Sequence, residues 1–167
     1  MHLTNTGPSV NNNDILRRLR YAFDFRDATM VEIFAAADHS VTQQQVVNWL
    51  RKEDDAAYCA ATDTELALFL NGLINTRRGR REGEQPKPET RLSNNMILMK
   101  LKIALNMTSD DMLQTLQAAE FCLSKHELSA FMRKPGNKHY RECKDQVLRN
   151  FLMGVQRTFR PGTTPDA

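Results

Sequence analysis

Apolar residues recur along the chain at the spacing of an α-helix, not at that of a strand. The first stripe runs through Ile15, Leu16, Leu19, Ala22 and Phe23. Three more follow it: Met30, Ile33, Phe34 and Ala37; Val46, Trp49 and Leu50; Leu66, Phe69, Leu70 and Leu73. Each stripe covers one face of a helix, and no segment alternates with the period of two that a strand requires. The pattern predicts four helices within residues 13–78 and an all-α fold.

The same four stripes return later in the chain. Residues 13–78 align without a gap on residues 95–160, and 18 of the 66 aligned pairs are identical, among them Asn13/Asn95 and Gly72/Gly154. We interpret the chain as a tandem duplication of a four-helix unit. This interpretation divides the chain into a predicted flexible N-terminal extension (1–12), helical repeat 1 (13–78), a charged linker (79–94), helical repeat 2 (95–160) and a flexible tail (161–167). Units this small are expected to pack against each other.

Capping residues and turn signals mark the helix boundaries. The predicted N-caps are Asp27 and Ser109 for the second helices, Thr42 and Ser124 for the third, and Asp63 and Asp145 for the fourth. A loop is expected after each third helix, at residues 53–55 and 135–137. The glycine inside each fourth helix indicates close packing against another helix.

Several segments resemble a known family, the YehS-like bacterial proteins. The resemblance rests on NNDILRRLRYAFD, MVEIFAAAD, VVNWLRKEDD and FLNGLI in the first repeat, and on LSAFMRKPGNKHYREC and FLMGV in the second. It covers residues 12–160. The resemblance implies a duplicated helical domain of unknown function, and it supplies no activity, cofactor or catalytic residue.

Composition places the chain among ordinary globular proteins. There are 23 Lys and Arg against 20 Asp and Glu, a net charge of +3 that by itself does not indicate a polyanionic partner. The chain has no apolar run of 18 residues and no charged-then-apolar start, so we expect a cytoplasmic protein without a membrane partner. Three cysteines without CxxC spacing indicate reduced thiols.

The near-neutral total hides a difference between the repeats. The first carries 8 basic and 10 acidic residues, and the second carries 11 basic and 6 acidic residues. Tyr140 and His139 lie among the basic residues of the second repeat, a combination that can stack single-stranded bases. The candidate nucleic-acid or anion-binding residues are Arg51, Lys52, Arg133, Lys134, Lys138, Tyr140, Arg141, Lys144 and Arg149. A structural role for the tyrosine at the same place in both repeats is the alternative.

The second and third helices of each repeat have the outline of a helix-turn-helix. Ala36 or Ala118 is the small residue of the first helix, and a cap follows at the turn. The exposed face of the third helix would then present Gln43, Gln44 and Gln45, whose amides can bind adenine edges. Any two short helices at a tight turn share this outline, so it is a weak indication of DNA binding.

One spacing resembles a zinc site, and no motif indicates catalysis. Cys122, His126, His139 and Cys143 are separated by 3, 12 and 3 residues, but the first repeat has no matching ligands, so we expect no metal. Phosphate-binding, dinucleotide-binding and hydrolase motifs are missing, so we expect neither catalytic residues nor a cofactor. The sequence favours a non-enzymatic binding or adaptor protein that engages a protein partner, with self-association as one form of this. The alternative is nucleic-acid binding through the basic second repeat.

Overall fold

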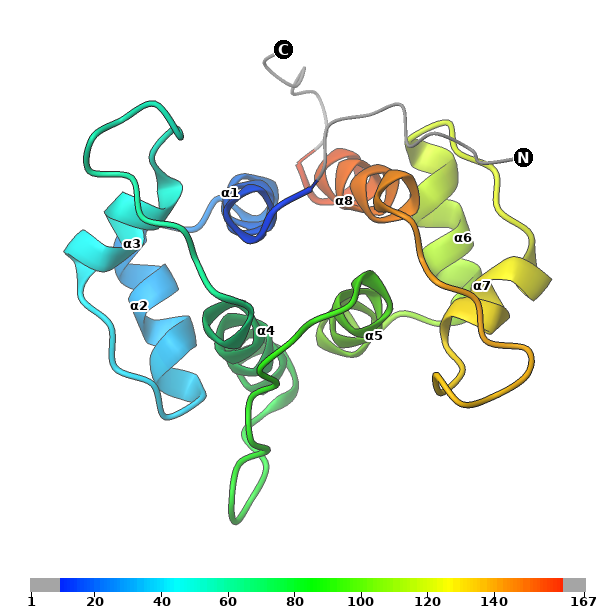
Figure 1. Ribbon diagram of the computed structural model, residues 1–167, viewed down its shortest axis with the longest axis horizontal. Coiled ribbons are helices and arrows are strands. Elements are labelled where there is room, and N and C mark those ends of the chain that lie inside the picture. Colours follow the sequence, from blue (N-terminus) through cyan, green and yellow to red (C-terminus); the bar gives the residue numbers. More distant parts are fainter. Residues whose placement is uncertain (1–9, 161–167) are drawn as a thin grey trace.

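The computed structural model describes residues 10–160, which form eight helices and no strand (Figure 1). The helices are α1 (Asn12–Phe23), α2 (Asp27–Ala36), α3 (Gln43–Leu50), α4 (Asp63–Arg78), α5 (Asn94–Ala104), α6 (Ser109–Ala118), α7 (Lys125–Phe131) and α8 (Asp145–Phe159). The all-α prediction with four helices in each repeat is confirmed. The predicted tail and most of the predicted N-terminal extension lie outside the described residues.

Four helices, two from each repeat, form the centre of the molecule. Figure 1 shows α1, α4, α5 and α8 together in the middle, with α2 and α3 on one flank and α6 and α7 on the other. The closest central pairs are α1 with α8 and α4 with α5, and both pairs join one repeat to the other. Because the repeat converts α1 into α5 and α4 into α8, these two pairs are equivalent. The repeats therefore pack against each other about an approximate twofold axis.

The buried residues follow the predicted apolar stripes in both repeats. Leu19 and Leu101, and likewise Phe69 and Phe151, are fully buried. They belong to one continuous core that includes residues from both repeats. A single core explains how two units of this size become stable, since apolar burial grows with the size of the folded unit.

The glycines of α4 and α8 allow another helix to approach closely. A Cβ atom at Gly72 would lie 1.8 Å from the backbone oxygen of Ile33, and one at Gly154 would lie 1.9 Å from that of Thr115. Both distances are far below contact distance, so no larger residue fits there without movement of the backbone. The close packing predicted for these glycines is confirmed.

A buried asparagine ties together three segments of each repeat. Asn13 donates from Nδ2 to the carbonyl oxygens of Trp49 (2.8 Å) and Cys59 (2.9 Å) and accepts from the Ala61 N–H (3.0 Å). Asn95 makes the equivalent bonds to Phe131, Arg141 and Cys143. These bonds satisfy backbone groups in the loop after the third helix, and thereby fix that loop against the first helix.

Rare backbone conformations also repeat. Asp24 and Asn106 have positive φ values of 54° and 52°, and Asp38 and Glu120 have values of 59° and 58°. These pairs occupy equivalent positions, one or two residues after the first and second helices of each repeat. Left-handed residues at helix ends close the last turn, so both repeats end these helices in the same way.

The predicted N-caps are correct for the third helices and one residue off elsewhere. Thr42 and Ser124 accept from backbone N–H groups as expected. The N-caps of α4 and α6 are Thr62 and Thr108, while α2 and α8 begin after Arg26 and Lys144, which make no side-chain cap bond. Asp63, predicted as a cap, instead accepts from the Asn12 amide (2.8 Å) and the Leu92 N–H (2.8 Å).

The segment between α4 and α5 contains no helix but is attached to both repeats. Glu89 forms an ion pair with Lys100 at 3.0 Å, and its backbone oxygen accepts from Thr64 at 3.1 Å. Lys100 also donates to Asn71 at 2.7 Å. These bonds hold the end of the segment beside α4 and α5. None of the helices described is both long and apolar enough to cross a membrane.

Candidate functional surface of the second repeat

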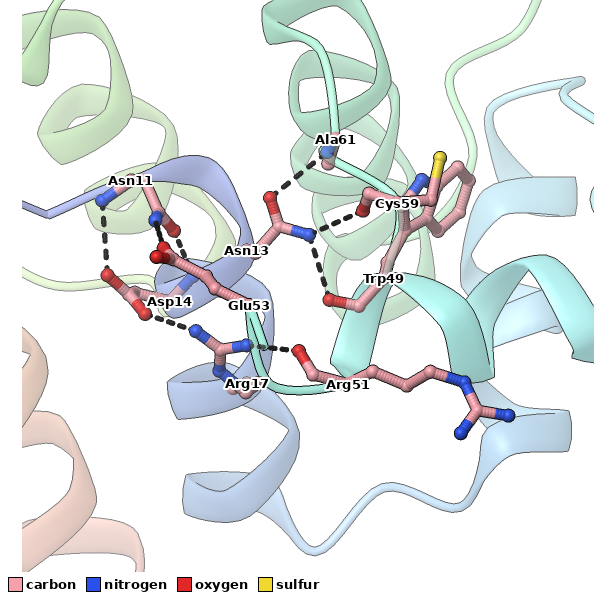
Figure 2. A network of polar contacts seen from close by, with 9 residues as sticks. All are labelled: Asn11, Asn13, Asp14, Arg17, Trp49, Arg51, Glu53, Cys59 and Ala61. Atoms are coloured by element: carbon pink, nitrogen blue, oxygen red, sulfur yellow. Dashed lines mark hydrogen bonds and ion pairs between the residues drawn. The ribbon is translucent and has the colours of Figure 1, made fainter. Parts of the chain in front are cut away.

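In the first repeat, a polar network connects α1 with the loop after α3. Figure 2 shows Asp14 bound to Arg17 and to the backbone N–H of Asn11. Arg17 donates to the backbone oxygen of Arg51 at 2.8 Å, and the Asn11 side chain donates to Glu53 at 2.9 Å. Three charged side chains and an amide therefore cover this side of α1.

The second repeat has methionines at the same place. Met96 and Met99 stand where the first repeat has Asp14 and Arg17, and Pro135 stands where it has Glu53. A groove of about 340 Å³ opens there between α5 and the end of α7. Its apolar lining consists of Met96, Met99, Ile103, Phe131, Met132, Pro135 and Tyr140. We call it the methionine groove.

The rim of the methionine groove is basic. Lys100, Arg133 and Lys134 line it beside the apolar residues. Lys100 is occupied by Glu89, the one carboxylate of the lining, whereas no carboxylate of residues 10–160 pairs with Arg133 or Lys134. Ile103 is 41% exposed, an unusual state for a large apolar side chain in this structure. An apolar floor with free cations at one end is a surface suited to an amphipathic ligand.

A second cavity lies on the other side of Arg133. It has a volume of about 320 Å³ and is lined by His126, Glu127, Ser129, Ala130, Arg133, Lys138, His139 and Arg141. Three of the lining residues are permanent cations at neutral pH, two are histidines, and one is a carboxylate. We call this cavity the basic pocket.

The structure brings together only part of the predicted nucleic-acid or anion-binding set. Arg133, Lys138 and Arg141 meet in the basic pocket, while Lys134 and Tyr140 line the methionine groove. Tyr140 is half-buried beside methionines, whereas His139 lines the other cavity, so the two rings predicted to stack bases do not line one cavity.

The remaining predicted residues lie elsewhere. Lys144 pairs with Glu142 at 3.4 Å, and Arg51 pairs with Asp55 at 3.3 Å. Lys52 is exposed in the first repeat. Arg149 lies on α8 close to Arg18, whose pKa is lowered by burial and, to a lesser extent, by the charge of Arg149. None of these four residues lines either cavity.

The predicted zinc-like set is not assembled. His126 and His139 share the basic pocket, but Cys122 is exposed and Cys143 is buried. Burial, together with the smaller effects of the Asp145 and Glu142 charges, raises the pKa of the Cys143 thiol to about 12, so this side chain is a protonated core residue at neutral pH. Within residues 10–160, no three His, Cys, Asp or Glu side chains lie together in a way that could hold a metal ion.

The amides of the helix-turn-helix-like element mostly bind one another. Gln44 donates to Asn48 at 3.0 Å, Arg51 donates to the same Asn48 oxygen at 3.1 Å, and Gln45 accepts from the Thr42 N–H at 2.9 Å. Within residues 10–160, Gln43 makes no such bond. The exposed face of α3 is therefore engaged only in part by bonds within the protein.

Sequence reasoning missed the residues that line the methionine groove. Met96, Met99 and Ile103 lie on the α5 face opposite to its buried stripe. The sequence alone contained an indication of this surface. Met96 and Met99 stand where the first repeat has charged residues, and Ile103 stands where it has a tyrosine, whose ring carries a hydroxyl group. Exposed apolar residues at positions where the other repeat has polar residues indicate a candidate ligand-binding surface.

Comparison with known proteins agrees with the duplicated architecture. The family model described as "Protein of unknown function (DUF1456)" matches residues 12–79 and again residues 94–160. The chain is 42% identical over 144 residues to the protein named "Uncharacterized protein YehS" of Escherichia coli (strain K12), across 86% of this chain and 92% of that relative. No solved structure matches the chain. Both repeats match one family model, and the chain therefore belongs to the DUF1456 family of proteins of unknown function.

Proposed function

We propose that this protein is a non-enzymatic adaptor that engages a protein partner through the methionine groove of its second repeat. The observation that carries the proposal is the contrast between the repeats. Each repeat has a cavity beside its first helix, of about 310 Å³ in the first repeat and about 340 Å³ in the second. In the first repeat this region carries the bonded charges of Asp14, Arg17 and Glu53, whereas in the second its lining is mostly apolar. Exposed apolar surface is unfavourable unless a partner covers it.

The residues of the groove suit a protein segment. Methionine side chains are flexible and polarisable, and surfaces rich in them adapt to apolar side chains of different shapes. Arg133 and Lys134 add free positive charge at the rim. We therefore expect an amphipathic helix as the ligand, with apolar residues spaced three and four apart and acidic residues at one end.

A binding role fits the groove better than a catalytic one. The carboxylate of its lining, Glu89, is held by Lys100 at 3.0 Å. The other polar groups are cations, a serine, a tyrosine and the buried Asn95, whose amide is used by the backbone. This arrangement provides no base beside a nucleophile, which acid–base and covalent catalysis require.

Nucleic-acid binding is the second candidate, favoured by the three cations of the basic pocket. Two observations make it the weaker one. Gln44 and Asn48 of α3 are bound to each other, and the equivalent loop of the first repeat carries Glu53, Asp54 and Asp55, which would repel phosphates. A duplex would have to contact both repeats to use the duplicated element.

Site-specific photo-cross-linking in cells tests the adaptor role. A photoreactive amino acid at position 103 lies in the groove, and the same amino acid at position 21 provides the matched control in the first repeat. We expect one dominant protein adduct from position 103 and none of comparable yield from position 21. Adding Arg133→Glu with Lys134→Glu should remove that adduct, because the rim charges would then repel an acidic segment.

The adduct must also map to a suitable segment of its partner. A synthetic peptide of that segment should bind the purified protein and should fail to bind a Met99→Arg variant. Equal adduct yields at positions 21 and 103, or an adduct that survives the charge reversal, would contradict the proposal.

A further inference from the structure

The basic pocket differs from its counterpart in the first repeat in a way that points to an anionic ligand. In the first repeat, Arg51 has acceptors for its guanidinium. Its Nε donates to Asn48 at 3.1 Å, and its Nη1 pairs with Asp55 at 3.3 Å. The charge of this arginine is thus balanced by its own loop.

The equivalent arginine of the second repeat has lost both acceptors. Arg133 has Ala130 where Arg51 has Asn48, and Asn137 where it has Asp55. The loop itself is unchanged, because Asn137 Oδ1 accepts from the His139 N–H at 2.8 Å just as Asp55 Oδ1 accepts from the Ala57 N–H at 2.8 Å. The substitution at position 137 therefore removes a negative charge while it keeps the turn.

Further donors have been added around this arginine. His126, Lys138, His139 and Arg141 stand where the first repeat has Gln44, Ala56, Ala57 and Cys59. All four line the same pocket as Arg133. Within residues 10–160, no carboxylate forms an ion pair with Arg133, Lys138 or Arg141, and the nearby Glu142 is bound to Lys144. Glu127 is the one acid in the lining.

We propose that this pocket binds the phosphate group of a phosphate monoester. A dianion matches the excess of positive charge left after Glu127 is counted, and two guanidinium groups can each bind two oxygens of a phosphate. Concave shape separates this site from a nucleic-acid surface, because its cations converge on one cavity and do not form a stripe. The site is separate from the methionine groove, and the two share only Arg133.

Amide chemical-shift titration of the full chain tests the proposal. The probes are methyl phosphate as a monoester, inorganic phosphate, dimethyl phosphate as a diester and a 12-nucleotide single-stranded DNA. We expect methyl phosphate to shift the amides of residues 126–141 and to leave those of residues 44–59 unchanged. Dimethyl phosphate, with one charge, should bind at least about 10-fold more weakly.

The variant Asn137→Asp tests directly whether the missing carboxylate leaves Arg133 available for phosphate. It restores the carboxylate of the first repeat without changing the size of the side chain, so it should pair with Arg133 and weaken methyl phosphate binding by about 10-fold. Lys138→Ala with His139→Ala restores two further residues of the first repeat and should weaken it at least as much. Arg51→Ala is the matched control and should have no effect. Asn137, Lys138 and His139 are exposed and Arg51 is half-buried, and none of them belongs to the core. Circular dichroism checks the fold of each variant.

The competing outcomes separate the possible ligands. If inorganic phosphate and methyl phosphate bind equally, the site is assigned to free phosphate. If methyl phosphate binds more tightly, the site is assigned to an esterified phosphate, as proposed. DNA that binds more tightly than methyl phosphate with a steep salt dependence would overturn the proposal in favour of nucleic acid. Shifts spread equally over both repeats, or unaffected by Asn137→Asp, would also overturn it. Because Met99 and Ile103 are left intact, failure here leaves the adaptor proposal untouched.

Discussion

The two repeats share a core and differ at the surface around their first and third helices. Buried leucines and phenylalanines, the buried asparagine and the glycine of the fourth helix are the same in both. The surface between the first helix and the loop after the third helix is charged and internally bonded in the first repeat, and it holds a groove and a basic pocket in the second. Both repeats therefore share the same core, whereas the methionine groove and the basic pocket lie in the second repeat.

This contrast separates structural residues from functional ones without an alignment of relatives. A residue found at equivalent positions with equivalent bonds, such as Asn13 and Asn95, is explained by the fold. Arg51 and Arg133 also occupy equivalent positions in the two repeats, yet their partners differ. Arg133 therefore lacks the acceptors that bind Arg51, and the ligand proposed above would supply acceptors in their place.

The largest effect is expected where the repeats agree most closely. Gly72→Ala places a methyl group against the backbone oxygen of Ile33, and Gly154→Ala places one against that of Thr115. Each should lower the free energy of unfolding by about 3 kcal/mol, since a helix pair must move apart. Urea denaturation measures this loss. Gly136→Ala is the control, because open space surrounds that position, and it should change stability by less than about 0.5 kcal/mol.

Removing the buried asparagines should have the next largest effect. Asn13→Ala leaves two carbonyl oxygens and one N–H without their partner, and Asn95→Ala does the same in the second repeat. Each should cost about 2 to 3 kcal/mol of unfolding free energy. Thermal unfolding of both variants checks this, with the exposed Gln43→Ala as a control. A large difference in unfolding free energy between the two variants would mean that the buried asparagines do not play the same structural role in the two repeats.

A smaller effect on stability, with a clear effect on the surface, is expected from exchanging the groove residues. Met96→Asp with Met99→Arg should recreate the ion pair of Asp14 and Arg17 and change stability by less than about 1 kcal/mol, because the pair is partly exposed. An apolar fluorescent dye should lose most of its binding. The reverse pair, Asp14→Met with Arg17→Met, should increase dye binding to the first repeat. Unchanged dye binding in both variants would show that the methionine groove is not an accessible apolar surface.

The sequence predicted the parts of this molecule that depend on local periodicity. The apolar stripes located all eight helices, because each helix buries one face in the core. The caps were less certain, since Asp63 and the preceding Thr62 are both good capping residues and the choice depends on the bond between Asp63 and Asn12. That bond joins residues 51 positions apart, which no local pattern reveals.

The candidate sites were predictable only in part for the same reason. The excess of basic residues in the second repeat was visible, but which cations gather depends on where the loop after α7 lies. Lys144 and Arg149 are close in sequence to Arg141, yet Lys144 pairs with Glu142 and Arg149 faces α1. The methionine groove joins α5 to residues at least 28 positions later, so its walls come together only in the fold.

The smallest effect concerns the start of the second helices, where the repeats differ at two positions. Thr108 and Asp111 form a capping box at α6, and a hydrogen bond from the Thr108 N–H holds the pKa of Asp111 below its usual range. The equivalent residues of α2, Arg26 and Thr29, form no such box. A carboxylate whose pKa is lowered by folding stabilises the folded state above its unfolded pKa of about 4, and this stabilisation is lost as the pH falls through the lower folded value. Amide hydrogen exchange, corrected for intrinsic rates, should therefore show the first turn of α6 opening more readily at pH 3 than at pH 6, with no comparable change in α2. Asp111→Asn should remove that pH dependence, and persistence of the effect in this variant would assign it to another group.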